Sequence, residues 1–133
     1  MIPATMTCIE IARPGGPDVL SPATRPTPCP GVGEVLIKVA AAGINRPDLL
    51  QRQGLYPAPP DASDLPGLEV AGTIVALGEG VSAPAVGAAI CALVAGGGYA
   101  EYVTVDARLC LPLPTGYDFV RAAERRWSNP RFA

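Results

Sequence analysis

Glycine and proline interrupt this sequence so often that a long helix has little room to form. The chain contains 15 glycines and 16 prolines among 133 residues, more than a fifth of its length, against about 12% in average proteins. Proline breaks a helix interior and glycine weakens it, while both residues are common in turns between short strands. Since they follow no three-residue period, a collagen-like chain is excluded. We therefore expect a compact, turn-rich and mainly β fold.

Composition narrows the class of protein further. Hydrophobic residues make up 49% of the chain and charged residues 17%, which is too apolar for an intrinsically disordered protein. The net charge is −2, and no basic stripe is interleaved with aromatic residues, so we expect no nucleic-acid partner. No apolar run is long enough for a membrane helix, and no signal-peptide pattern is visible. These features predict a cytoplasmic protein of one domain, or one domain and part of a second.

The sequence contains no histidine, which excludes Ser-His-Asp and Cys-His catalysis and every zinc site that uses His. The four cysteines form no C-x-x-C pair, so a zinc ribbon or thioredoxin motif is also absent. Cys8, Cys91 and Cys110 lie in apolar or strand-like runs and are expected to be buried thiols. Cys29 lies between two prolines and is expected to be exposed.

Alternating apolar residues and flanking turn residues predict strands over residues 6–11, 34–41, 68–77, 86–94, 99–105 and 109–113. The proline-rich segment 22–33 is expected to be an extended loop. Two short helices are predicted. One begins near Asn45, with Pro47 and Asp48 in its first turn and Gly54 at its end. The other begins at Phe119, after residues that can cap it.

Three blocks of the sequence, in order and naturally spaced, resemble one enzyme family. They are residues 42–56 (AGINRPDLLQRQGLY), 66–78 (PGLEVAGTIVALG) and 96–103 (GGGYAEYV). In these blocks the chain resembles the zinc-independent quinone oxidoreductases of the medium-chain dehydrogenase/reductase superfamily. The resemblance implies a GroES-like, partly open β-barrel with one or two short helices. It also implies hydride transfer from NADPH to a quinone or an activated enone.

The resemblance predicts a division of the chain. Residues 1–118 would form the GroES-like, substrate-side catalytic domain, and residues 119–133 the truncated start of a linker helix toward a Rossmann domain. The 133 residues contain no dinucleotide fingerprint, because the glycines at 96–98 lie between predicted strands and do not open a βαβ unit. After residue 123 the sequence departs from the family pattern. We therefore expect this chain to bind NADPH very weakly and to be inactive by itself.

The resemblance also argues against a metal. Zinc alcohol dehydrogenases of this superfamily carry a Cys near position 43 and a Gly-His-Glu where this chain has Gly67-Leu68-Glu69. These positions offer neither a thiolate nor an imidazole, so no catalytic zinc is expected. Glu69 is instead expected to make a structural hydrogen bond.

Asn45 and Tyr56 are the candidate catalytic residues that the family implies. The amide of Asn45 would bind the nicotinamide ribose or orient the substrate; the alternative is that Asn45 only caps the helix. Tyr56 would face the quinone and the nicotinamide, supplying ring stacking and a hydroxyl donor. Its alternative is a half-exposed loop aromatic that packs on neighbouring prolines.

Asp48 and Gln53 are further candidates for substrate binding. Asp48 could polarise a substrate group, or its carboxylate could balance the helix dipole in the first turn. For Gln53 the sequence does not separate a substrate contact from an exposed side chain. A rival interpretation of the whole chain is a non-enzymatic β-barrel module or an inactive fragment. In either case we expect an exposed apolar face that favours a homodimer or aggregation.

Overall fold

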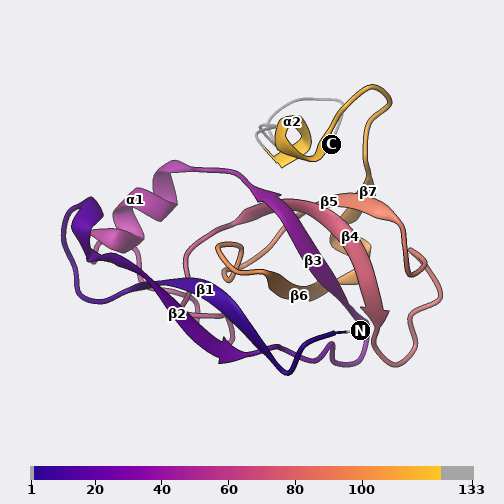
Figure 1. The fold of residues 1–133 in the computed structure, drawn as a ribbon, viewed down its shortest axis with the longest axis horizontal. Helices are drawn as coiled ribbons and strands as arrows, with labels where there is room; N and C mark the ends of the chain where they lie inside the picture. Colours follow the sequence, from indigo (N-terminus) through magenta and orange to yellow (C-terminus); the bar gives the residue numbers. More distant parts are fainter. Residues whose placement is uncertain (1, 124–133) are drawn as a thin grey trace.

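The computed structural model describes residues 2–123 of the chain. The strands are β1 (Thr5–Ile11), β2 (Leu20–Pro26), β3 (Glu34–Ala42), β4 (Glu69–Leu77), β5 (Ala89–Leu93), β6 (Tyr102–Asp106) and β7 (Cys110–Pro112); the helices are α1 (Arg46–Arg52) and α2 (Phe119–Ala123), as drawn in Figure 1. Two 3₁₀ turns precede β2 and β7. The predicted continuation of the linker over 124–133 lies outside the described residues.

The strands form two antiparallel sheets. One is the pair β1-β2, and the other has the order β6-β3-β4-β5-β7. A bridge between Cys8 and Ala100 joins β1 to the segment that leads into β6. It is flanked by hydrogen bonds from Ile9 N–H to the Tyr99 carbonyl (2.8 Å) and from Glu101 N–H to the Thr7 carbonyl (3.0 Å). Because β6 and β7, the outer strands of the larger sheet, do not pair with each other, the expected mainly β, partly open barrel is confirmed.

The prediction of an extended loop over residues 22–33 is wrong in its first half, because β2 runs through Pro26. Pro22 and Pro26 pair with Ile9 and Thr5 of β1. The hydrogen bonds between the two strands fall on the alternate residues, as in the bond from Thr27 N–H to the carbonyl of residue 4. Both prolines therefore occupy positions whose missing N–H would face away from β1, where an edge strand tolerates proline.

The main core lies between β3, β4, β5 and β6. Its fully buried members include Val35, Ile37, Val70 and Ile74, which alternate with residues of the opposite sheet face as the period of a strand requires. A second cluster forms where Ala122 and the rest of α2 cover the other face of β4 and β5. Helix α2 begins where predicted, with Arg121 N–H donating to Asp118 Oδ1 at 2.8 Å.

The segments around Gly67 and Gly98 approach each other more closely than side chains would allow. Gly67 has a φ of +102°, and a Cβ atom on it would lie 2.5 Å from the Tyr99 nitrogen. Gly98 N–H donates to the Gly67 carbonyl, and Tyr99 N–H donates to the Pro66 carbonyl, both at 3.0 Å. These contacts replace a strand ladder at residues 98–99. As a result β6 begins at Tyr102, later than the sequence predicts.

Candidate functional site

Helix α1 begins at a reciprocal contact between Asn45 and Asp48. Asn45 is the N-cap residue and Pro47 lies in the first turn, where its missing N–H costs nothing. The backbone N–H of Asn45 donates to Asp48 Oδ2 at 2.9 Å, and the N–H of Asp48 donates to the Asn45 carbonyl at 3.0 Å. The predicted helix start is confirmed, with Asn45 as the N-cap residue and Asp48 in the first turn.

The Asp48 carboxylate is buried and gathers three donors from distant parts of the chain. Besides the Asn45 N–H, Oδ2 accepts from the hydroxyl of Tyr99 at 3.0 Å, and Oδ1 accepts from the N–H of Gly67 at 3.1 Å. The same hydroxyl lies 3.2 Å from the Gly43 carbonyl oxygen, a second acceptor. Burial, together with the negative charge of Asp48, raises the pKa of Tyr99 well above its ordinary value. The hydroxyl of Tyr99 therefore stays protonated and acts as a donor.

The side chain of Asn45 turns to a second carboxylate. Its Nδ2 donates to Glu69 Oε2 at 3.0 Å, and Glu69 is only 3% exposed at the start of β4. The backbone of Gly43 supports this contact, because its N–H donates to the Glu69 carbonyl at 2.8 Å. The expected structural hydrogen bond of Glu69 is thus present. It fixes the orientation of the Asn45 amide, whose catalytic role stays a prediction from the family resemblance.

Tyr56 and Gln53 lie outside this network. Gln53 ends α1, where its N–H donates to the Leu49 carbonyl at 3.1 Å, and its side chain is exposed. Tyr56 lies in the loop after the helix with 38% of its surface exposed. Within the described residues neither side chain makes a hydrogen bond. The structure brings Asn45, Asp48 and Glu69 together, while the substrate roles of Gln53, Tyr56 and Asp48 stay predictions.

The sequence missed Tyr99 as a member of the site. Its block resembles the family and predicts a strand after a glycine run, but nothing local reveals a partner 51 residues earlier in the sequence. Tyr99 and Asp48 also line a groove of about 570 Å3 between α1 and the neighbouring strands. Most of the groove is apolar. Its apolar side chains come from Ile9, Leu20, Val39, Ala40, Ala41, Ala42, Ile44, Leu49, Pro66 and Ala100.

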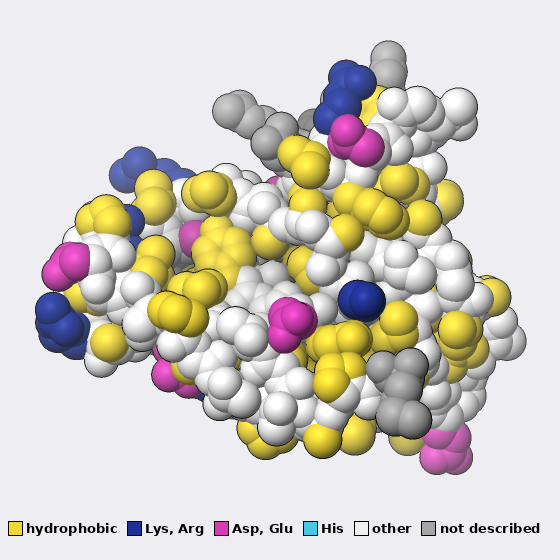
Figure 2. Space-filling model, in the orientation of Figure 1, with side chains coloured by type: hydrophobic (Ala, Val, Ile, Leu, Met, Phe, Trp, Pro, Cys, Tyr) yellow, Lys and Arg dark blue, Asp and Glu magenta, His cyan; other side chains and the backbone are white. Residues whose placement is uncertain are grey.

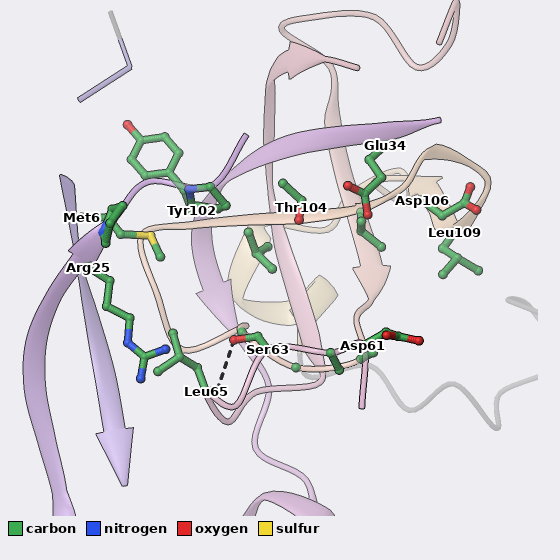
Figure 3. Close-up of a pocket in the computed structure, with 18 residues that line it drawn as sticks. Met6, Arg25, Glu34, Asp61, Ser63, Leu65, Tyr102, Thr104, Asp106 and Leu109 are labelled. Atoms are coloured by element: carbon green, nitrogen blue, oxygen red, sulfur yellow. Dashed lines mark hydrogen bonds between the residues drawn. The ribbon is translucent and has the colours of Figure 1, made fainter. Parts of the chain in front are cut away.

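A second cavity, of about 370 Å3, lies beside β6 and the loop that precedes β4 (Figure 3). Two of its four charged residues, Arg25 and Asp106, form ion pairs within the chain. Arg25 contacts Glu10 and Asp64, both at 2.7 Å, and Arg108 contacts Asp106 at 2.6 Å. Hydrogen bonds from Arg108 lower the pKa of Asp106 to about 2. None of the predicted site residues lines this cavity.

Residues 2–123 contain no group of three or more Cys, Asp or Glu side chains arranged to hold a metal ion. In the same part of the chain, no helix is long and apolar enough to cross a membrane. The polar groups at the start of α1 place the Tyr99 hydroxyl and the Asn45 amide, both neutral hydrogen-bonding groups, beside two carboxylates.

Comparison with known proteins extends these findings. A synaptic vesicle membrane protein VAT-1 homolog from Rattus norvegicus is 38% identical over 120 residues, covering 89% of this chain and 30% of the relative. A quinone oxidoreductase from Lama guanicoe is 39% identical over 120 residues, covering 89% of this chain and 36% of the relative. The chain thus spans about a third of the length of these relatives. The resemblance to quinone oxidoreductases of the medium-chain dehydrogenase/reductase superfamily is confirmed.

Solved structures agree. A mycobacterial quinone oxidoreductase superposes with a TM-score of 0.78 at 39% identity, covering 89% of this chain and 36% of the other. A mycobacterial protein solved in complex with NADPH gives 0.76 at 37% identity, with 89% and 37% coverage. The family described as "Alcohol dehydrogenase GroES-like domain" matches residues 31–115, which hold β3 to β7 and the whole of α1. The chain therefore belongs to the family of alcohol dehydrogenase GroES-like domains.

Proposed function

We propose that this chain is the substrate-side catalytic domain of an NADPH-dependent quinone oxidoreductase. One observation carries the proposal: the similarity to quinone oxidoreductases covers 89% of the chain and includes the strand-to-helix junction where Glu69 holds the Asn45 amide. The proposed reaction is hydride transfer from the nicotinamide to a quinone or an activated enone. The quinone is the proposed small-molecule partner.

The residues of this chain can contact the nicotinamide end of NADPH. Asn45 has a fixed amide and Tyr56 an accessible ring, so these two can receive the nicotinamide and the quinone. The glycines at 96–98 do not offer a phosphate cradle, because Gly97 N–H donates to the Leu65 carbonyl (2.9 Å) and Gly98 N–H to the Gly67 carbonyl (3.0 Å). Among the described residues we assign no group to the pyrophosphate, and we propose that this chain by itself binds NADPH very weakly.

When bound, NADPH supplies the hydride, and the protein supplies position and polarity. We propose that the Asn45 amide binds the nicotinamide ribose or orients the substrate. The ring of Tyr56 stacks on the flat quinone, and its hydroxyl donates to a quinone oxygen. Asp48 and Gln53 contribute substrate contacts at the same helix. The resulting acceleration comes from holding two reactants in a productive orientation.

A chimera tests the proposal. Residues 1–123 of this chain would replace the matching segment of the mycobacterial quinone oxidoreductase, and oxidation of NADPH by 1,4-benzoquinone would be followed spectroscopically. We expect turnover by the chimera and none by the 133-residue chain. Asn45→Ala and Tyr56→Ala in the chimera should each lower kcat/KM by at least about tenfold. Gln51→Ala on the same helix, outside the proposed site, is the matched control.

The rival function is a non-enzymatic β-barrel module. It predicts a folded chimera that binds NADPH through the cofactor domain of the mycobacterial enzyme and shows no quinone-dependent turnover. Micromolar affinity of the 133-residue chain for NADPH would instead contradict the proposal that this chain by itself binds NADPH very weakly. We also propose that the protein is cytoplasmic and that its site uses no metal. Cell fractionation tests the first point, and metal analysis of the purified chain tests the second.

A further inference from the structure

The groove between α1 and the neighbouring strands exposes more apolar surface than a solvated face normally does. Leu20, Ile44 and Leu49 line it and are 37%, 78% and 42% exposed. Figure 2 shows hydrophobic side chains gathered over α1 and the adjacent strand β1. A contiguous apolar surface of this kind, when it is concave, is typical of a ligand or partner site.

One cation lines this apolar groove. Arg52 stands in the last turn of α1 and is tied to Gly15 by two hydrogen bonds. Its Nε donates to the Gly15 carbonyl at 3.1 Å, and its own carbonyl accepts from the Gly15 N–H at 3.0 Å. Within residues 2–123 no ion pair engages the Arg52 guanidinium, in contrast to Arg25 and Arg108, which both contact carboxylates.

The groove's one carboxylate does not balance that cation. Both oxygens of Asp48 already accept hydrogen bonds from Asn45, Gly67 and Tyr99. The side chain of Asp48 is therefore fixed within the fold. Arg52 is the one positively charged residue that lines the groove, and within residues 2–123 its two terminal nitrogens make no hydrogen bond. A guanidinium recognises a carboxylate best, by two parallel hydrogen bonds.

From this geometry we propose that the groove binds an apolar chain that ends in a carboxylate, such as a medium-chain monocarboxylate. The apolar tail lies along the groove against Leu20, Ile44 and Leu49, and the carboxylate contacts Arg52. The volume of about 570 Å3 lies within the range of about 300–1,000 Å3 that ligand pockets show. Asn45 and Tyr56 do not line the groove, whereas Asp48 does, so this site adjoins the proposed quinone site and shares only Asp48 with it.

Titration calorimetry of the 133-residue chain with hexanoate, octanoate, decanoate and 1-decanol tests the proposal. If the tail is buried, affinity should rise up to roughly fourfold per added methylene. Decanoate should bind about tenfold more tightly than 1-decanol, because only the acid contacts the guanidinium. The two ligands have the same chain length, so they separate the charged contact from the apolar one.

Variants identify the residues responsible. Arg52→Gln should lower the affinity for decanoate about tenfold and leave the affinity for 1-decanol unchanged. Arg52→Lys should retain part of the preference for decanoate over 1-decanol. Arg108→Gln, which removes a positive charge outside the groove, should change neither. Leu49→Asp, at a half-exposed position, should abolish binding of both ligands. Circular dichroism of each variant verifies folding, and Arg52→Lys serves if Arg52→Gln does not fold.

Three results would overturn the proposal. Equal affinity for decanoate and 1-decanol in the native chain would remove the role of Arg52. An affinity that does not depend on chain length would place the ligand outside the groove. Sedimentation that shows a dimer, unaffected by decanoate and disrupted by Leu49→Asp, would assign the groove to a second copy of the chain.

Discussion

The hydroxyl of Tyr99 donates a 3.0 Å hydrogen bond to the carboxylate of Asp48, although the two residues are 51 positions apart in the sequence. This bond joins the start of α1 to the segment that leads into β6. Because Gly67 donates to the same carboxylate, the start of β4 is tied in as well. The candidate site is therefore positioned by long-range contacts.

Tyr99→Phe removes the hydroxyl and leaves the ring. A buried hydrogen bond to a carboxylate stabilises a fold by about 1.5–3 kcal/mol, so we expect the free energy of unfolding in urea to fall by about 2 kcal/mol. Tyr56→Phe is the matched control, because the Tyr56 hydroxyl makes no hydrogen bond within the described residues; it should change stability by less than about 0.5 kcal/mol. Equal losses in the two variants would contradict the role given to Tyr99.

Gly67→Ala should be far more destabilising than Gly80→Ala. Both glycines have positive φ, +102° and +81°, but a Cβ on Gly67 would lie 2.5 Å from the Tyr99 nitrogen, while Gly80 has nothing within 4 Å. We expect a loss of about 3 kcal/mol or more for Gly67→Ala and about 1–2 kcal/mol for Gly80→Ala, from backbone strain alone. Urea midpoints at constant m-value measure both. Similar midpoints would mean that the two segments separate easily.

Asn45→Asp places a carboxylate where an amide now donates to Glu69 Oε2 at 3.0 Å. Two carboxylates this close raise the pKa of the pair in the folded state. The folded variant then binds more protons than the unfolded chain, so its stability falls as pH rises. Relative to the native chain, we expect a loss of about 3 kcal/mol at pH 7 and a smaller loss near pH 4.

Asn45→Ser is the control for this pH dependence. Serine is a good N-cap residue and introduces no charge, so its cost, about 1 kcal/mol, should change much less between the two pH values than that of Asn45→Asp. Urea unfolding at pH 4 and pH 7 provides the comparison. A pH-independent loss in Asn45→Asp would show that Glu69 and residue 45 do not interact directly in solution.

The cysteines should differ strongly in reactivity. Cys29 is exposed, whereas Cys8 and Cys91 are buried. Burial raises the pKa of Cys110 from 9.0 to about 11, and the neighbouring Cys91 and Asp106 add to the shift. At pH 8 we expect iodoacetamide to modify Cys29 first, with a thiolate fraction about 100-fold smaller at Cys110 than in a thiol of pKa 9.0.

Peptide mass spectrometry after timed labelling measures the extent of modification at each cysteine.

The raised pKa of Cys110 also affects stability. Because this pKa is higher in the folded state, the folded chain keeps the thiol proton of Cys110 to a higher pH than the unfolded chain does. Its contribution to stability is complete below pH 9 and is lost as the pH rises toward about 11. Cys110 labelling as fast as Cys29 labelling at pH 8 would rule out the burial described here.

The sequence predicted those features that depend on neighbouring residues. The cap at Asn45, the first-turn proline and the helix after Asp118 are local patterns, and all three are present. The strand through Pro22 was missed, because proline is acceptable only at positions set by the pairing with β1. Tyr99 and the groove were missed for a related reason: both depend on segments that only the complete fold brings together.

The missing N–H groups of Pro22 and Pro26 face away from β1, and this also affects whether the chain can assemble through its strand edges. The free side of β2 presents the backbone of Pro22, Thr24 and Pro26, and two of these three residues have no N–H to offer an incoming strand. Strand addition, the first step of amyloid-like stacking, is therefore disfavoured at this edge. With the free edge of β2 protected in this way, the apolar groove can stay accessible to a ligand without promoting strand addition at that edge.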